Sequence, residues 1–155
     1  MQAVKWREAA VWGGGLGVLV VLWQLVSAGL GLTSLFVPVA TTIELVVLAA
    51  ALRSARADHS FVQQLVLAVA VAVSAGVLIM GGSMLVTGVL FPELLDATRA
   101  EVLGQMQAAG ESPERIATVM ASIAPGPQAV TGFLGTVATA VVFAPPLAWL
   151  VGREA

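Results

Sequence analysis

Polar side chains inside otherwise apolar stretches are the residues of this chain that could do chemistry. Glu44 is the only ionisable residue within a predicted membrane segment, where an ionised acid costs about 2.5 to 3.5 kcal/mol. At about 1.5 Å per residue along a helix, Glu44 and three neutral residues lie about 9 to 15 Å from the outer ends of their segments. The predicted polar layer comprises Glu44, Gln24, Thr136 and Thr139. It serves either to hydrogen-bond the helices together or as a proton or cation site at Glu44.

Other site types are excluded by composition. The chain has no cysteine, which excludes disulfides, thiolate metal sites and cysteine nucleophiles, and its single histidine, His59, excludes multi-histidine metal sites. A hydrolase within the membrane needs a nucleophile and a base that converge, but the predicted spans contain no histidine and one acid. The formal charge of −2 is too weak for nucleic-acid binding. We therefore expect no enzymatic activity, no metal and no cofactor.

The elements that position these residues are membrane helices. Apolar residues make up 59% of the 155-residue chain and charged residues 10%, and mean hydropathy is +0.97. A helix needs about 20 mostly apolar residues to cross a bilayer. Four stretches meet or approach this length: residues 9–30, 35–52, 61–90 and 129–151. We expect an all-α fold, with residues 1–155 forming one integral membrane four-helix bundle.

The first and third spans each leave alternatives open. The first is preceded by Lys5 and Arg7 and contains the small-residue site Val26-Ser27-Ala28, as in a secretory signal. Its apolar run exceeds the usual length of about 7 to 15 residues, so a retained helix is favoured. The third, over residues 61–90, must tilt, kink near Gly81-Gly82 or emerge into water, because it is longer than a bilayer requires.

The segment Pro92 to Gln128 is acidic and predicts an amphipathic helical hairpin outside the membrane. Gly110 suits the end of its first helix, and Ser112-Pro113 suits the start of the second. Pro125-Gly126-Pro127 is expected to block helix continuation. The apolar stripes of the two helices pack against each other or the bundle, lie on lipid headgroups, or dock a partner. The candidate partner surface is Met106, Ile116, Met120 and Ile123.

The basic residues predict orientation, because cytoplasmic loops of membrane proteins carry an excess of lysine and arginine. One side has five (Lys5, Arg7, Arg53, Arg56, Arg153), and the other has Arg99 and Arg115. Both termini are therefore expected in the cytoplasm, with the hairpin outside it.

Two sequence patterns bear on how the helices pack. Gly13 and Gly17, and the ladder Ala68, Ala72 and Gly76, place small residues on one helix face, where backbones can approach closely. Packing within one chain is favoured over a dimer interface. Pro145-Pro146 is expected to kink the last span.

A resemblance to a known family is carried by short motifs in the second half of the chain. They are Gln105-Met106, the run Gly110-Glu111-Ser112-Pro113-Glu114-Arg115-Ile116, Met120, Pro125 and Gly132-Phe133-Leu134-Gly135. The chain resembles domain of unknown function 4199, a family of small bacterial membrane proteins. The similarity is densest over residues 91–154 and rests on span order before that. It implies four spans, an outward hairpin and a bacterial inner membrane, and it brings no activity or ligand.

Two functions remain open at this stage. The first is a non-enzymatic structural or accessory bundle in the lipid bilayer, whose hairpin caps it or meets a membrane-protein partner. The second is a small homo-oligomeric transporter or channel with a proton or cation site at Glu44. A cavity that reaches Glu44 favours transport, whereas a dry Glu44 bonded to its neighbours favours the first function.

Overall fold

The computed structural model describes residues 6–153, except for the side chains of Thr33 and Arg153. Lys5 and Glu154, which the sequence analysis used, lie outside the described residues. Within them, all regular secondary structure is helical. The helices are α1 (Trp6–Gly29), α2 (Thr33–Ala55), α3 (Phe61–Leu85), the π-helical segment η1 (Val86–Leu90), α4 (Glu93–Ala108), α5 (Pro113–Ser122) and α6 (Pro125–Arg153). The expected all-α fold is confirmed.

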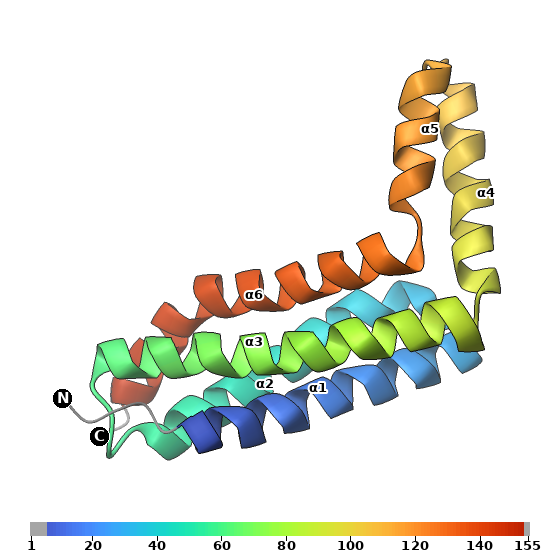
Figure 1. Cartoon of the computed structure of the whole chain (residues 1–155). Helices are drawn as coiled ribbons and strands as arrows, with labels where there is room; N and C mark the ends of the chain where they lie inside the picture. Colours follow the sequence, from blue (N-terminus) through green and yellow to red (C-terminus); the bar gives the residue numbers. More distant parts are fainter. Residues whose placement is uncertain (1–5, 154–155) are drawn as a thin grey trace.

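Four of the helices in this described part are long and apolar enough to cross a membrane: Trp6–Gly29, Ser34–Ala55, Phe61–Leu90 and Pro125–Gly152. They lie side by side as a bundle in which α3 packs against both α1 and α6 (Figure 1). Large apolar side chains, such as those of Val11, Val46 and Val142, are exposed on its outside. A bundle with an apolar exterior of this kind is suited to a lipid surrounding.

The interfaces of α3 depend on glycines. A Cβ on Gly13 would lie 2.5 Å from the Ser74 Cβ, and one on Gly17 would lie 2.8 Å from the Leu78 Cβ. On the opposite side of α3, a Cβ on Gly76 would lie 2.6 Å from the Phe133 ring of α6. These small residues therefore pack helices within one chain, which is the favoured interpretation of the sequence pattern.

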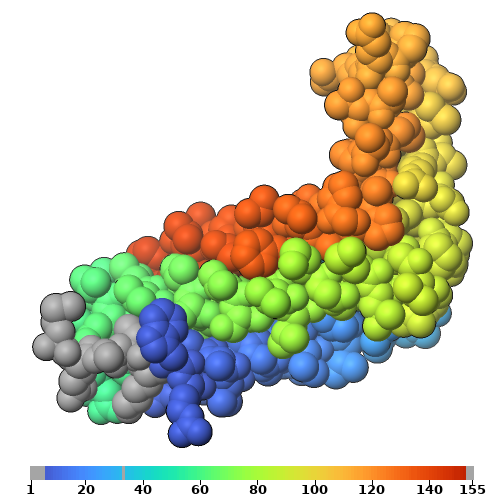
Figure 2. Space-filling model, in the orientation of Figure 1, coloured from blue at the N-terminus to red at the C-terminus, as the bar shows by residue number. Residues whose placement is uncertain are grey.

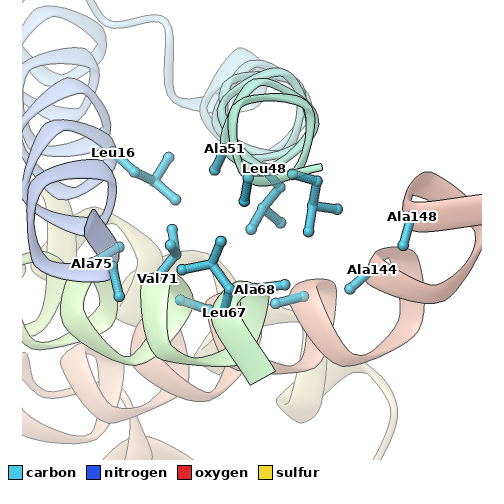
Figure 3. Packing of buried hydrophobic residues seen from close by; sticks show 14 of the residues in the cluster. Leu16, Leu48, Ala51, Leu67, Ala68, Val71, Ala75, Ala144 and Ala148 are labelled. Carbon is cyan, nitrogen blue, oxygen red and sulfur yellow. The ribbon is translucent and has the colours of Figure 1, made fainter. Parts of the chain in front are cut away.

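A tightly packed core fills the half of the bundle nearer the ends of the chain. Leu16, Leu48, Leu67 and Val71 are fully buried there. Alanines from α2, α3 and α6 complete the packing and bring α2 close to the end of α6: Ala51, Ala68, Ala75, Ala144 and Ala148 (Figure 3). The helix α6 continues through Pro145 and Pro146, and its last turns lie at an angle to the rest (Figure 1). This angle agrees with the predicted kink.

The third span begins at a capping box, in which the Ser60 side chain accepts from the Gln63 backbone and the Gln63 side chain accepts from the Ser60 backbone. Of the three alternatives for this long span, the structure does not have the kink at Gly81-Gly82, because α3 is continuous there and Gly82 packs against Val21. The irregularity lies instead at η1, where the Phe91 N–H donates to the Val86 carbonyl at 2.8 Å. The wider π turn ends the span before the chain enters the hairpin.

The helices α4 and α5 form a hairpin that projects from the end of the bundle (Figures 1 and 2). As expected, Gly110 adopts a left-handed conformation between them, with φ of 70°. The Ser112 side chain accepts from the Arg115 backbone N–H, and Pro113 is the first residue of α5.

The predicted end of the hairpin at Gln128 is wrong. The preceding helix α5 ends at Ser122, in agreement with the expected block, but Pro125-Gly126-Pro127 also begins α6, so the last long helix starts four residues before the predicted span. The physical reason is that the N–H groups of a first helical turn have no intrahelical acceptor, so proline loses no hydrogen bond there.

Candidate functional site

The bundle contains a cavity of about 520 Å³ in its half nearer the hairpin. All four long helices contribute to its wall, and Leu95 of α4 lines it at the base of the hairpin. Its polar lining consists of Gln24, Thr41, Glu44, Ser83, Thr87, Gln128, Thr131, Thr136 and Thr139. The structure thus places the four residues of the predicted polar layer around one cavity.

Glu44 lies deep in this cavity and joins α2 to α6. Its side chain is buried, and its Oε1 accepts a hydrogen bond of 2.7 Å from the Thr136 hydroxyl. Thr136 is buried as well. This is the one hydrogen bond that the Glu44 side chain makes with the described residues, whereas a carboxylate can accept about four hydrogen bonds. The carboxyl group therefore keeps capacity for a further donor.

Gln24 and Thr139 do not bond to Glu44. The Gln24 Oε1 accepts a 3.0 Å hydrogen bond from the hydroxyl of Ser83, so this pair joins α1 to α3. Thr139 lies one turn beyond Thr136 on α6 and lines the cavity, half-buried. The predicted layer is therefore two separate interhelical pairs on the wall of one cavity, with Thr139 between the cavity and the core.

The cavity is closed toward the chain ends. Beyond Glu44 in that direction, buried apolar residues of α2 and α6 fill the interface: Leu48, Ala51, Leu52, Ala140, Ala144 and Ala148. Toward the hairpin the lining residues become exposed, with Val37 of α2 67% exposed and Gln128 and Thr131 of α6 also exposed. The cavity therefore opens between α2 and α6 at the hairpin end, and Glu44 lies near its closed end.

The polar lining includes residues that the sequence analysis missed: Ser83, Thr41, Thr87, Gln128 and Thr131. A signal for Ser83 existed. It lies seven residues before the end of the third predicted span, or about 10.5 Å deep, which is close to the depth of Gln24. Applying the depth count to every serine and threonine would therefore have found it.

The electrostatic character of the cavity comes from one group. Among the described residues that line it, Glu44 is the ionisable one, and none of them is a lysine, arginine or histidine. Within residues 6–153, no group of three or more His, Cys, Asp or Glu side chains could hold a metal ion. A single carboxylate beside neutral hydroxyls is suited to a ligand that donates hydrogen bonds or carries one positive charge.

The proposed partner surface on the hairpin is partly covered by the hairpin itself. Met106, Ile116 and Met120 are half-buried where α4 and α5 pack side by side (Figure 1). Ile123 is buried and presents little surface to a partner. Its carbonyl accepts a 2.7 Å hydrogen bond from Arg99 Nε, which ties the end of α5 to α4.

A family model described as "Protein of unknown function (DUF4199)" matches residues 11–153. The match includes the first three spans as well as the second half, where the sequence motifs lie. Neither the curated proteins nor the solved structures include a match to this chain.

Proposed function

Because the chain belongs to the DUF4199 family of proteins of unknown function, membership brings no activity, and we propose a function from the cavity itself. The protein is a non-enzymatic accessory protein of the membrane that binds a small ligand at Glu44. The observation that carries this proposal is a cavity that reaches Glu44 from the hairpin end and is closed toward the chain ends by a packed core. A cavity of about 520 Å³ lies within the range of small-molecule binding sites, about 300 to 1,000 Å³.

The chemistry of the lining supports binding rather than catalysis. Around Glu44 lie hydroxyl and amide groups, which can position a ligand but are weak nucleophiles without a neighbouring base. The hydroxyl nearest the carboxylate, that of Thr136, is engaged in an interhelical hydrogen bond. The side chains that meet in this cavity therefore have the character of a recognition site.

Transport is the second candidate function, because a cavity that reaches Glu44 is the feature expected to favour it, and an intramembrane acid within a cavity is also the arrangement of a proton or cation site. It is placed second because the packed core closes the cavity toward the chain ends. Leu48 and Ala140 lie at the packed interface that separates the cavity from the opposite end of the bundle. A path through a single chain would have to open this interface. A transporter would therefore need a second copy of the chain or a large rearrangement of α2 and α6.

We also propose that the protein lies in a bacterial inner membrane with both termini in the cytoplasm. The beginning of α1 and the end of α6 lie at the same end of the bundle, opposite the hairpin (Figure 1). Three arginines lie at that end of the bundle: Arg7 at the start of α1, and Arg53 and Arg56 at the end of α2. The hairpin carries Arg99 and Arg115. The excess of positive charge at the first end supports a cytoplasmic location for it.

Single cysteines in this cysteine-free chain test the cavity. Thr131→Cys and Thr139→Cys should react with a small membrane-impermeant thiol reagent from the hairpin side only. Ala148→Cys, in the packed core, should react from neither side and serves as the control. Reaction of Thr139→Cys from both sides would overturn the closed cavity and favour transport.

Two exposed positions report orientation in the same experiment. In intact cells, Gln107→Cys on the hairpin should be labelled, and Ala57→Cys in the connection after α2 should not. The reverse pattern would overturn the proposed orientation. A flux assay with vesicles of the purified protein separates the two functions. Proton or cation flux that is lost in Glu44→Gln at an unchanged melting temperature would show that the function is transport rather than accessory binding.

A further inference from the structure

We propose that the ligand of this cavity is a primary ammonium compound with an apolar body. Its protonated amine would lie against Glu44, and its hydrocarbon part would follow the apolar wall toward the hairpin end. This assignment rests on the proposed binding function and names the chemical class that the cavity recognises.

Size favours a ligand larger than a bare ion. A water molecule occupies about 30 Å³ of liquid, so a cavity of about 520 Å³ is far larger than a proton or a monatomic cation requires. A molecule of organic size fills it. The lining runs from Glu44, near the closed end, to Leu95 at the base of the hairpin, and a chain-like ligand could contact both ends.

Charge determines which end of such a ligand enters first. Glu44 is the ionisable group of the lining, and the packed core beyond it offers no polar surface. A cation that pairs with this carboxylate removes the cost of an isolated charge in an apolar surrounding. An anionic head would meet repulsion at the same place, so fatty acids and phosphate monoesters are disfavoured.

Hydrogen-bonding capacity favours a primary amine over a quaternary one. A primary ammonium group has three N–H donors and no acceptor. Beside the Glu44 carboxylate, Thr41 lies one turn earlier on α2, and Thr139 lies one turn after Thr136 on α6. Each supplies a hydroxyl oxygen that can accept. Two hydroxyls and a carboxylate therefore provide as many accepting groups as the ammonium has donors.

Apolar side chains form a large part of the remaining wall, beside the neutral residues Gln24, Ser83, Thr87, Gln128 and Thr131, and can contact a hydrocarbon body. Val20 of α1 and Ile79 of α3 are buried on one side, and Phe36, Val37 and Ala40 of α2 line another. Burying apolar ligand surface against such a wall favours binding. The cavity thus has its charged group, Glu44, near the closed end and mixes apolar with neutral polar side chains toward the hairpin, and an amine with an apolar body matches the position of the charge.

Binding of n-octylammonium to the full-length protein in phosphatidylcholine nanodiscs tests the proposal. Equilibrium dialysis of the radiolabelled compound, with empty nanodiscs subtracted, measures Kd directly. Because hydrogen bonds to charged groups contribute about 1.5 to 3 kcal/mol, Glu44→Gln should raise Kd about 10- to 150-fold. Glu101→Gln removes an equal charge from the exposed face of the hairpin and should leave Kd unchanged. Equal affinity in the wild type and Glu44→Gln would overturn the proposal.

A cavity-filling substitution tests the location independently of the charge. A Cβ on Gly135, which lines the cavity, would meet no atom within 4 Å, so Gly135→Leu places a side chain in open space. This variant should lose octylammonium binding. Gly15→Leu is the matched control, because a Cβ there also meets nothing within 4 Å and the residue does not line the cavity. Retained binding in Gly135→Leu would place the ligand elsewhere and overturn the assignment.

Matched probes test the chemistry of the head group. Octanol and octyltrimethylammonium carry the same chain, and both should bind more weakly than octylammonium, the first for lack of charge and the second for lack of N–H donors. Equal binding of octyltrimethylammonium would overturn the primary-amine assignment. Displacement of octylammonium by equimolar sodium or potassium would indicate an inorganic cation site and would also overturn it.

The same ammonium chemistry occurs in a lipid headgroup. Nanodiscs that contain phosphatidylethanolamine distinguish the two sources, because a bound aminolipid would compete with octylammonium and raise its apparent Kd. Competition supports a lipid as the source of the ammonium group, and unchanged Kd supports a free amine. If octylammonium fails to bind while thiol labelling still finds the one-sided cavity, the ligand class is wrong and the binding function stands.

Discussion

Thr136→Val is the substitution that most directly tests how the candidate site is held together. It replaces the hydroxyl that donates to Glu44 Oε1 at 2.7 Å with a methyl group of nearly the same size. Both residues are buried, so the change removes the bond that joins α2 to α6 at the closed end of the cavity without creating a large void.

The magnitude follows from the environment of the bond. Hydrogen bonds between membrane helices contribute about 0.6 kcal/mol on average and about 1.7 kcal/mol at most. Glu44 as a whole residue is 7% exposed and lines a cavity, so the carboxyl group left without its donor is only partly separated from water. We therefore expect Thr136→Val to lower the free energy of unfolding by about 0.6 to 1.7 kcal/mol.

Thr139→Val is the matched control, because Thr139 lines the same cavity and does not donate to Glu44. We expect a change within about 0.5 kcal/mol for it, measured for both variants by unfolding in mixed micelles of dodecyl sulfate and a mild detergent. Glu44→Ala should cost about as much as Thr136→Val, and adding Thr136→Val to it should cost little more, because the two changes remove one bond. Equal effects of the two valine substitutions, or full additivity with Glu44→Ala, would refute this account.

Two further predictions concern helix packing and the hairpin. Gly13→Ala should destabilise the bundle by about 1 to 3 kcal/mol, because its Cβ would lie 2.5 Å from the Ser74 Cβ, whereas Gly14→Ala, where a Cβ meets nothing within 4 Å, should be neutral or slightly stabilising in the same unfolding assay. A destabilised Gly14→Ala would contradict this packing. Met120→Asp should open the hairpin by placing a charge between α4 and α5, which increased proteolysis of this segment would report, and Glu101→Lys on the exposed face should not. Identical proteolysis of both hairpin variants and the wild type would show that the stripes are not packed.

Properties set by neighbouring residues could be predicted from the sequence. The four long apolar segments follow from hydropathy and from the length that a bilayer requires. The turn of the hairpin follows from Gly110, which adopts φ of 70°, and from Ser112 and Pro113, which cap and begin α5. The start of α6 at Pro125 was not predicted, because a proline that follows the end of one helix can also be the first residue of the next, and the local sequence does not state where the next helix begins.

The partners of each polar residue could not be predicted, because the long helices are apolar around most of their circumference. Such a helix has no clear hydrophobic face to indicate its rotation toward its neighbours, so depth alone placed Gln24 and Glu44 in one layer. Contacts between helices determine the rotation: Gly13 and Gly17 bring α1 against α3, and Gln24 then meets Ser83. The sequence by itself determined the membrane helices, the hairpin and the depth of Glu44. Only the tertiary structure decided that Glu44 bonds to Thr136 and that the helices leave a cavity beside this bond, because the space between helices depends on how side chains from several helices pack together.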